Sequence, residues 1–166
     1  FIDGVSKTEG EVTGIEKITV SCDREKLSYF SFAENTFLVD EVPENFMIDH
    51  AFECVGGTGS EPAINQIIDR INPEGTIALA GVSENNVAIN TRMVLEKGLR
   101  LYGSSRSGRT DFEKTVRFLE NNPKEARYLE NLVGEVFEIN NIQDIHKAFD
   151  ADLNMRIGKT VLHWNK

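Results

Sequence analysis

Hydrophobic and polar positions along the chain change their period several times, from strand-like runs to helix-like stripes. The clearest helix begins near Ser60 and Pro62, and isoleucines then recur on one face of it through Ile71. The apolar run 76–80 follows without alternation, which is typical of a strand buried on both faces of a parallel sheet. This segment therefore predicts a helix that packs on a sheet of parallel strands.

The rest of the chain continues the same alternation. Further strands are predicted at residues 16–21, 35–39, 47–54, 99–103, 135–139 and 159–164. Further helices are predicted at residues 25–33, 91–97, 124–132 and 142–151. Strands and helices that alternate with short connections indicate an α/β fold with a doubly wound parallel sheet.

One more helix is predicted after the polar loop at residues 103–109. Thr110 is expected to be its N-cap, with Glu113 reaching back in a capping box. Phe112, Val116 and Leu119 recur at helical spacing and are expected to form its buried stripe.

The composition of the 166 residues, 40% hydrophobic and 27% charged, is that of an ordinary globular protein. Lys and Arg number 18 and Asp and Glu number 27, so the net charge of −9 disfavours nucleic acid and anionic membranes as partners. No apolar run approaches the ~20 residues of a membrane span, and we expect a cytoplasmic protein. Cys22 and Cys54 are expected to be free thiols.

Ligands of doubly wound sheets bind at the carboxyl ends of the strands, which makes four loops candidates for a site. These loops span residues 21–24, 54–59, 80–84 and 103–109. The last loop carries Arg106 and Arg109 among small hydroxyl residues, a pattern that suits an anionic ligand such as a phosphate. A plain glycine turn after residue 54 and a solvated surface loop at 103–109 stay open as alternatives.

The histidines do not indicate a metal site. His50, His146 and His163 lack partners at metal-ligand spacing, so each is expected to be structural or on the surface.

From Asp49 onwards the residues resemble the coenzyme-binding half of the medium-chain dehydrogenase/reductase family, the zinc-type alcohol and polyol dehydrogenases. The segments that carry the resemblance are 52–56 (FECVG), 73–76 (PEGT), 80–82 (AGV), 101–106 (LYGSSR) and 158–162 (GKTVL). The resemblance implies a Rossmann-like fold, a nicotinamide coenzyme and an oxidoreductase activity.

Longer segments resemble one branch of that family more closely. They are 49–57 (DHAFECVGG), 90–99 (NTRMVLEKGL) and 103–109 (GSSRSGR). That branch acts on ribitol 5-phosphate and ribulose 5-phosphate and supplies CDP-ribitol for cell-surface polymers such as teichoic acid. The resemblance implies a reductase that passes hydride from NADPH to the C2 carbonyl of ribulose 5-phosphate, while a zinc ion polarises the carbonyl oxygen.

The resemblance also implies roles for individual residues. Those expected along the ribose and pyrophosphate of the coenzyme are Cys54, Val55 and Gly56. Those expected around the nicotinamide are Ala80, Gly81, Val82, Ser104 and Ser105. Arg106 takes the position of an arginine that reaches the substrate in sorbitol-type members, and Arg109 is expected to help hold the sugar phosphate.

The tip of the strand at 16–21 indicates the choice of coenzyme. NAD enzymes place an acid at this tip, and NADP enzymes remove the acid and add a cation. Ser21 takes the tip position here, with Arg24 available for the 2′-phosphate. The pattern favours NADPH, and NADH stays open because Asp23 is close enough to swing inward.

Two parts of an intact family member have no counterpart in this sequence: the N-terminal catalytic domain with the zinc ligands, and the first strand, glycine fingerprint and first helix of the dinucleotide fold. Residues 1–14 are interpreted as a remnant of the helix connection or as flanks of another segment. We therefore expect residues 1–166 to be a partial coenzyme domain, incomplete at its N-terminal end. Alone it is expected to hold no zinc, to be inactive and to bind dinucleotides weakly or not detectably.

Two other functions stay open. One is a zinc-type alcohol or polyol dehydrogenase that acts on an uncharged sugar alcohol, for which Arg109 would be idle. The other is a non-catalytic Rossmann-like module for ligand sensing or oligomerisation. Residues 87–90 and 99–103 could supply an edge for the homodimer that we expect.

Overall fold

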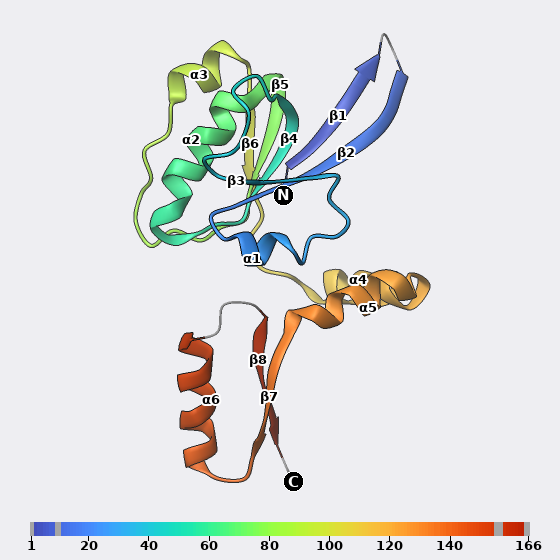
Figure 1. Cartoon of the computed structure of the whole chain (residues 1–166), viewed down its shortest axis with the longest axis vertical. Helices are drawn as coiled ribbons and strands as arrows, with labels where there is room; N and C mark the ends of the chain where they lie inside the picture. Colours follow the sequence, from blue (N-terminus) through green and yellow to red (C-terminus); the bar gives the residue numbers. More distant parts are fainter. Residues whose placement is uncertain (1, 9–10, 155–157, 165–166) are drawn as a thin grey trace. The chain divides into compact units, whose positions relative to one another are not determined.

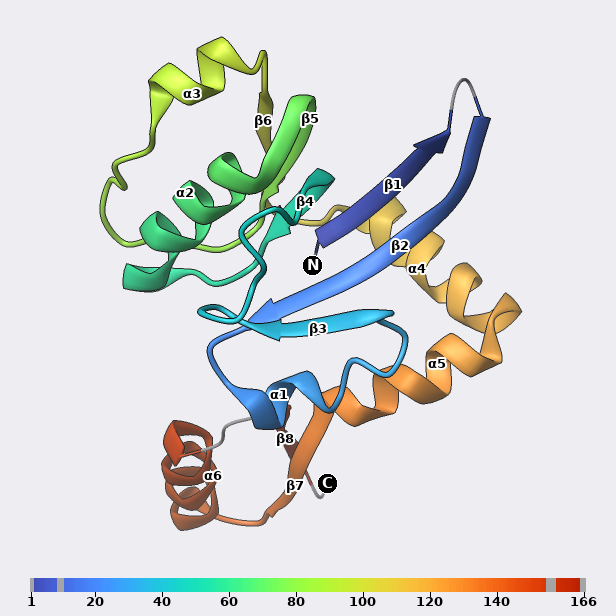
Figure 2. The same ribbon diagram turned by 45° about the horizontal axis from the view of Figure 1, so that its top comes forward.

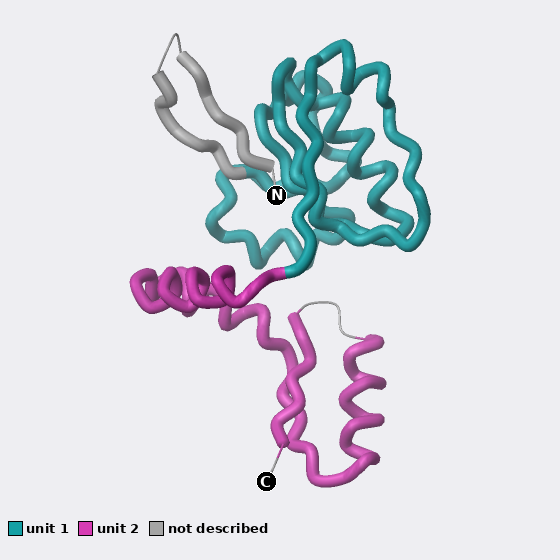
Figure 3. The backbone as a smooth tube through the Cα atoms, turned by 180° about the vertical axis from the view of Figure 1, so that it is seen from behind, with its two compact units in different colours: residues 1–106 teal, residues 107–166 magenta. Residues whose placement is uncertain are grey.

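The structure is a computed structural model that describes residues 2–8, 11–154 and 158–164, with the backbone alone for residues 2–8 and 11–17. The chain forms two compact units, which comprise residues 1–106 and 107–166 (Figure 3). Unit 1 holds a six-stranded sheet, and unit 2 holds a two-stranded sheet.

The sheet of unit 1 has the strand order β3-β2-β1-β4-β5-β6 (Figure 1, Figure 2). Its strands are β1 (Ile2–Thr8), β2 (Glu11–Ser21), β3 (Asn35–Leu38), β4 (Ile48–Glu53), β5 (Ile71–Leu79) and β6 (Arg100–Gly103). Strand β1 is antiparallel to both of its neighbours, and the other strands all run in one direction. The predicted α/β fold with parallel strands is confirmed.

Strand β1 fills the place between β2 and β4 and forms a hairpin with β2. Ile2 is in register with Ile18 of β2 on one side and with Ala51 of β4 on the other. The interpretation of residues 1–14 as part of a helix connection is therefore wrong for the described residues, which lie in strands. The physical reason is that β2 and β4 have N–H and C=O groups to pair, and a strand of either direction can pair them.

Helix α2 (Ser60–Arg70) closes the core of unit 1. Its residues Ile64, Ile67 and Ile68 are buried, and the helix packs against β4 and β5. The other buried members of this core are Ile18, Ile48, Ala51, Ile71 and Ile77. The predicted isoleucine stripe is confirmed, and β5 begins directly after the helix, earlier than the predicted start at residue 76.

Two short α-helices and the 3-10 helix η1 (Gly57–Gly59) complete unit 1. Helix α1 (Arg24–Leu27) ends well before residue 33, so the helix predicted at 25–33 is too long. The chain leaves it through a tight turn in which Phe30 N–H donates to Leu27 O at 3.1 Å, and the Phe30 ring then packs edge-on against Phe32. Helix α3 (Thr91–Glu96) lies where the sequence predicts it, and the Asn90 side chain caps it.

Unit 2 is a helical pair followed by a strand–helix–strand segment. Its elements are α4 (Arg109–Asn121), α5 (Pro123–Leu129), the 3-10 helix η2 (Glu130–Leu132), β7 (Val133–Ile139), α6 (Ile142–Asn154) and β8 (Lys159–Trp164). Strands β7 and β8 are parallel, and α6 packs against both (Figure 1). Across the described residues, no helix has the length and apolar character that a membrane span requires.

The start of α4 corrects two predictions. Its N-cap is Gly108 rather than Thr110, and the reaching side chain is Asp111 rather than Glu113, because Asp111 Oδ2 accepts Gly108 N–H at 2.9 Å. The stripe that contains Phe112 is also not buried: this side chain is 64% exposed, and α4 has no buried residue. The period of the stripe predicts a helix correctly, but burial needs a facing surface that unit 2 does not provide among its described residues.

Candidate functional site

The candidate loops of unit 1 leave the sheet along a single edge. Strands β2, β4, β5 and β6 run in the same direction, so residues 21–24, 54–59, 80–84 and 103–106 follow their carboxyl ends. This edge is where open parallel sheets bind ligands.

A buried carboxylate joins two of these loops. Glu53 is the last residue of β4 and is 2% exposed. Its Oε1 accepts hydrogen bonds from Val55 N–H at 2.8 Å, Gly56 N–H at 3.2 Å and the Ser60 hydroxyl at 3.1 Å. Its Oε2 accepts Gly81 N–H at 3.2 Å. These donors replace the water that the carboxylate loses on burial.

The backbone brings the same two loops into direct contact. Gly57 N–H donates to Val82 O at 2.8 Å, and Gly81 N–H donates to Glu53 O at 2.9 Å. Gly81 has no room for a side chain, because a Cβ would lie 2.5 Å from both Glu53 Oε1 and Gly56 N. Gly56 has a φ of 72°, in the left-handed region that favours glycine. Both glycines are therefore required by the close approach of the loops.

The structure thus brings together the coenzyme residues predicted on loops 54–57 and 80–82. These residues are Cys54, Val55, Gly56, Ala80, Gly81 and Val82. The side chains of Val55 and Val82 are 61% and 82% exposed, while the backbone beneath them is bonded. These two loops form an exposed surface, here called the ledge, whose backbone is held by hydrogen bonds.

The strand tip of β2 is held by local hydrogen bonds. Ser21 Oγ accepts Asp23 N–H at 3.1 Å, and Asp23 Oδ1 accepts Glu25 N–H at 2.9 Å as the N-cap of α1. Arg24 forms an ion pair with Glu41, and its side chain is 68% exposed. The Asp23 carboxylate therefore accepts a hydrogen bond from the backbone, and Arg24 lies at the surface.

The loop after β6 is exposed, and the residues predicted on it fall in both units. Ser104, Ser105 and Arg106 belong to unit 1, and Arg106 has a φ of 68°. Arg109 belongs to unit 2, where its Nε lies 2.7 Å from Glu113 Oε1 in an exposed ion pair. The roles predicted for these residues stay predictions.

The histidines with described contacts have hydrogen-bonding roles. His50 Nδ1 lies 2.6 Å from Thr76 Oγ1 between β4 and β5, and His163 Nδ1 lies 2.7 Å from Glu138 Oε1 between β8 and β7. The described residues contain no group of three or more His, Cys, Asp or Glu side chains that could hold a metal ion.

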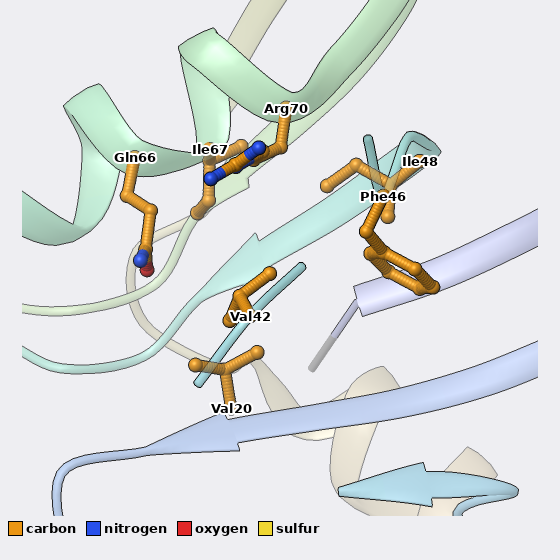
Figure 4. A pocket seen from close by; sticks show the side chains of 7 residues that line it. All are labelled: Val20, Val42, Phe46, Ile48, Gln66, Ile67 and Arg70. Carbon is orange, nitrogen blue, oxygen red and sulfur yellow. The ribbon is translucent and has the colours of Figure 1, made fainter. Parts of the chain in front are cut away.

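A small hollow beside α2 is a feature of packing rather than a polar site. It is lined by Val20, Val42, Phe46, Ile48, Gln66, Ile67 and Arg70 (Figure 4). Its two polar side chains are used elsewhere, since Gln66 Nε2 donates to Val39 O at 2.8 Å and Arg70 donates to Glu44 O. The lining is otherwise apolar and offers little to orient a ligand.

The sequence alone does not predict that Glu53, with Ser60 as one of its donors, joins the two loops. The signal was present as a carboxylate inside an apolar run, directly before a glycine-rich turn. A buried carboxylate requires several donors, but the sequence does not show that Gly81, 28 residues away, supplies one of them.

The parallel strands, with candidate loops at their carboxyl ends, are those of an open α/β sheet. A model of the zinc-binding dehydrogenase family matches residues 24–121, and the chain belongs to this family.

Among individual proteins, the chain is similar to ribulose-5-phosphate reductases. It is 55% identical over 139 residues to the one from Bacillus spizizenii, a match that covers 84% of this chain and 41% of that protein. It is 48% identical over 154 residues to the one from Streptococcus pneumoniae, covering 90% of this chain and 42% of that protein. The chain thus spans less than half the length of these relatives.

A solved relative has the same fold. The crystal structure of Staphylococcus aureus TarJ in complex with NADPH matches with a TM-score of 0.88 and 52% sequence identity, over 90% of this chain and 48% of that one. The 2R,3R-butanediol dehydrogenase of Bacillus subtilis, 14% identical with a TM-score of 0.71 over 89% of this chain and 43% of that one, shares the fold alone.

Proposed function

We propose that this chain supplies the coenzyme side of a reductase that converts ribulose 5-phosphate to ribitol 5-phosphate with NADPH. The observation that carries the proposal is the pair of loops 54–57 and 80–82, joined through Glu53 at the carboxyl edge of parallel strands. Its similarity to reductases of that name, and to a relative whose structure holds NADPH, supports the choice of substrate and coenzyme.

The residues of the ledge fit a nicotinamide coenzyme. Gly81 leaves no side chain between the two loops, and the exposed side chains of Val55 and Val82 offer apolar surface to a flat ring. The backbone of residues 80–82 would bond the carboxamide, and residues 54–56 would follow the ribose and pyrophosphate. When bound, NADPH supplies the hydride that adds to C2 of the ketose. The role proposed for this chain is to bind NADPH and to orient it.

Zinc is implied by the family name, but the described residues do not fit a zinc site. Because they offer no group of metal ligands, the role proposed for this chain is confined to coenzyme and substrate.

The direct test is a chimera in which residues 24–164 of this chain replace the homologous segment of the Staphylococcus aureus ribulose-5-phosphate reductase 1, 55% identical over 139 residues. We expect the chimera to oxidise NADPH with ribulose 5-phosphate and to act poorly on unphosphorylated ribulose. A folded chimera that binds no NADPH contradicts the proposal. Equal activity on both sugars would favour the alternative of an uncharged sugar alcohol as the product.

Arg24 is proposed to select NADPH over NADH. Its guanidinium would exchange the Glu41 carboxylate for the 2′-phosphate, while Asp23 stays engaged as a helix cap. Arg24→Ala in the chimera should lower the ratio of kcat/KM for NADPH to that for NADH, and Glu41→Gln should raise it. An unchanged ratio in Arg24→Ala would remove this assignment.

Arg106 is proposed to reach the substrate and Arg109 to help hold its phosphate, because both add positive charge to a chain of net charge −9. Arg106→Ala should raise KM for ribulose 5-phosphate without changing KM for NADPH. If both this KM and the turnover number stay the same, the assignment is abandoned.

A homodimer in the cytoplasm completes the proposal. Among the described strands of unit 1, β6 is an edge strand, and we propose that it pairs with a second copy of this chain. Sedimentation of the chimera should give the mass of a dimer, and a monomer at micromolar concentration would contradict this part.

A further inference from the structure

The Glu53 side chain is buried, and its hydrogen-bond partners lie both near it in the sequence and far from it. A carboxylate that is 2% exposed carries a desolvation cost that a neutral residue would avoid. Its hydrogen bonds are divided between two segments: Oε1 serves the turn after β4, and Oε2 serves the loop after β5. The side chain is therefore a link between the two loops.

The two carboxylate oxygens of Glu53 accept unequal numbers of hydrogen bonds, so an amide at this position would have one preferred orientation. Oε1 accepts three hydrogen bonds, from Val55, Gly56 and Ser60, whereas Oε2 accepts the one from Gly81. An amide in place of the carboxylate would keep its oxygen where three donors converge. Its NH₂ group would then face the Gly81 N–H, donor against donor.

The hydrogen bond between Glu53 and Gly81 affects the position of exposed residues in both loops. Gly81 precedes Val82, whose carbonyl accepts Gly57 N–H at 2.8 Å. A displacement of Gly81 therefore changes the position of residues 80–82 against residues 54–57, which the proposed function assigns to the nicotinamide and to the rest of the coenzyme. The Ser60 hydroxyl is a lesser member, because its loss leaves the Gly81 bond intact.

We infer that Glu53 is the positioning residue of the coenzyme site: its carboxylate holds loops 54–57 and 80–82 in the register that receives the nicotinamide end of the coenzyme. This inference rests on the proposed function. Glu53 itself lies beneath the ledge, so it acts through the backbone of the loops rather than on the reacting atoms.

The first measurement uses the chain as it is, without ligand. In ¹H–¹⁵N spectra, Glu53→Gln should displace the Gly81 amide resonance and leave those of Val55 and Gly56 close to their original positions. Ser60→Ala is the matched control and should leave Gly81 unchanged. If Glu53→Gln does not fold, Glu53→Asp, which keeps the charge but shortens the reach, should displace Gly81 in the same way. A Gly81 resonance that neither folded variant moves overturns the inference.

The second measurement uses the chimera. Glu53→Gln should raise KM for NADPH several-fold and leave KM for ribulose 5-phosphate unchanged, because the amide NH₂ would repel a Gly81 N–H that keeps its bond to the Glu53 backbone carbonyl. Ser60→Ala should have a smaller effect on the same constant. If Gly81 moves but KM for NADPH does not, Glu53 is a structural link only and the inference is overturned. A wild-type chimera that cannot use NADPH refutes the proposed function instead, and the Gly81 resonance still decides whether Glu53 joins the loops.

Discussion

In unit 1, helix α2 lies on the sheet and closes a core in which Ile48, Ile68 and Ile77 are at most 1% exposed. In unit 2, the buried apolar residues of the described part are Ile139 and Ala148, whereas Phe112 is 64% and Phe149 is 63% exposed. Both units have helices with regular apolar stripes. They differ in how much of a stripe is covered, because α2 buries three isoleucines whereas α4 has no buried residue.

Because its core is buried, unit 1 is the part of the chain that can hold a site in a fixed geometry. Buried contacts resist local opening, so unit 1 should be the last part to unfold. The Glu53 carboxylate lies at the end of a core strand of that unit, which gives the two loops a fixed base. The loop 103–109, which carries Arg106 and Arg109, is exposed throughout and includes the last residue of unit 1.

The largest expected effect breaks the core of unit 1. Ile68→Ala should lower the free energy of unfolding of unit 1 by about 2–5 kcal/mol, because it leaves a cavity at a side chain with no exposed surface. The matched control in unit 2 is Phe112→Ala, which should change stability by no more than about 0.5 kcal/mol. Urea unfolding followed by amide resonances of each unit measures both. Similar costs for the two variants would erase the distinction between the units.

A smaller effect is expected at the end of α2. Lys97 Nζ donates to Ile68 O at 2.7 Å, Asp69 O at 3.0 Å and Ile71 O at 2.9 Å, which caps the helix with a positive charge. Lys97→Met keeps the length of the side chain and should cost about 1–3 kcal/mol in the same unfolding experiment. An unchanged midpoint would show that the cap contributes nothing to unit 1.

The smallest effect is expected in unit 2 and depends on pH. The Asn140 N–H, and after it the Lys147 side chain, lower the pKa of Asp144, which lies in the first turn of α6. Stability from this group is therefore complete above the ordinary pKa of an aspartate and is lost as pH falls through the lowered value.

Asp144→Asn removes this contribution, so the stability of unit 2 should become less dependent on pH in the acid range. Melting temperatures of both proteins between pH 2 and pH 6, on the scale of an ordinary aspartate titration, provide the measurement. Parallel curves for the two proteins would argue against a contribution of the Asp144 carboxylate to the stability of unit 2.

Much of the fold is predictable because it depends on local period and turn residues. Helix α2, helix α3 and strand β8 follow directly from the sequence. The place of β1 beside β4 is not predictable in this way, because that pairing joins residues about 48 positions apart. The cap of α4 was misplaced by two residues, since Gly108 and Asp111 compete with Thr110 and Glu113 for the same role.

The candidate site is predictable in its parts but not in its organisation. The rule that ligands bind at the carboxyl ends of strands selects loops 54–57 and 80–82 correctly as neighbours. The bond from Gly81 to Glu53 is a contact between distant residues, and only the folded chain shows it.

The most direct test of the central claim is hydrogen exchange of the chimera with and without NADPH. We expect slower exchange on binding at residues 54–57 and 80–82 of this chain, with no change at the strand–helix–strand segment of unit 2. Unchanged exchange at both loops in a chimera saturated with NADPH would contradict it.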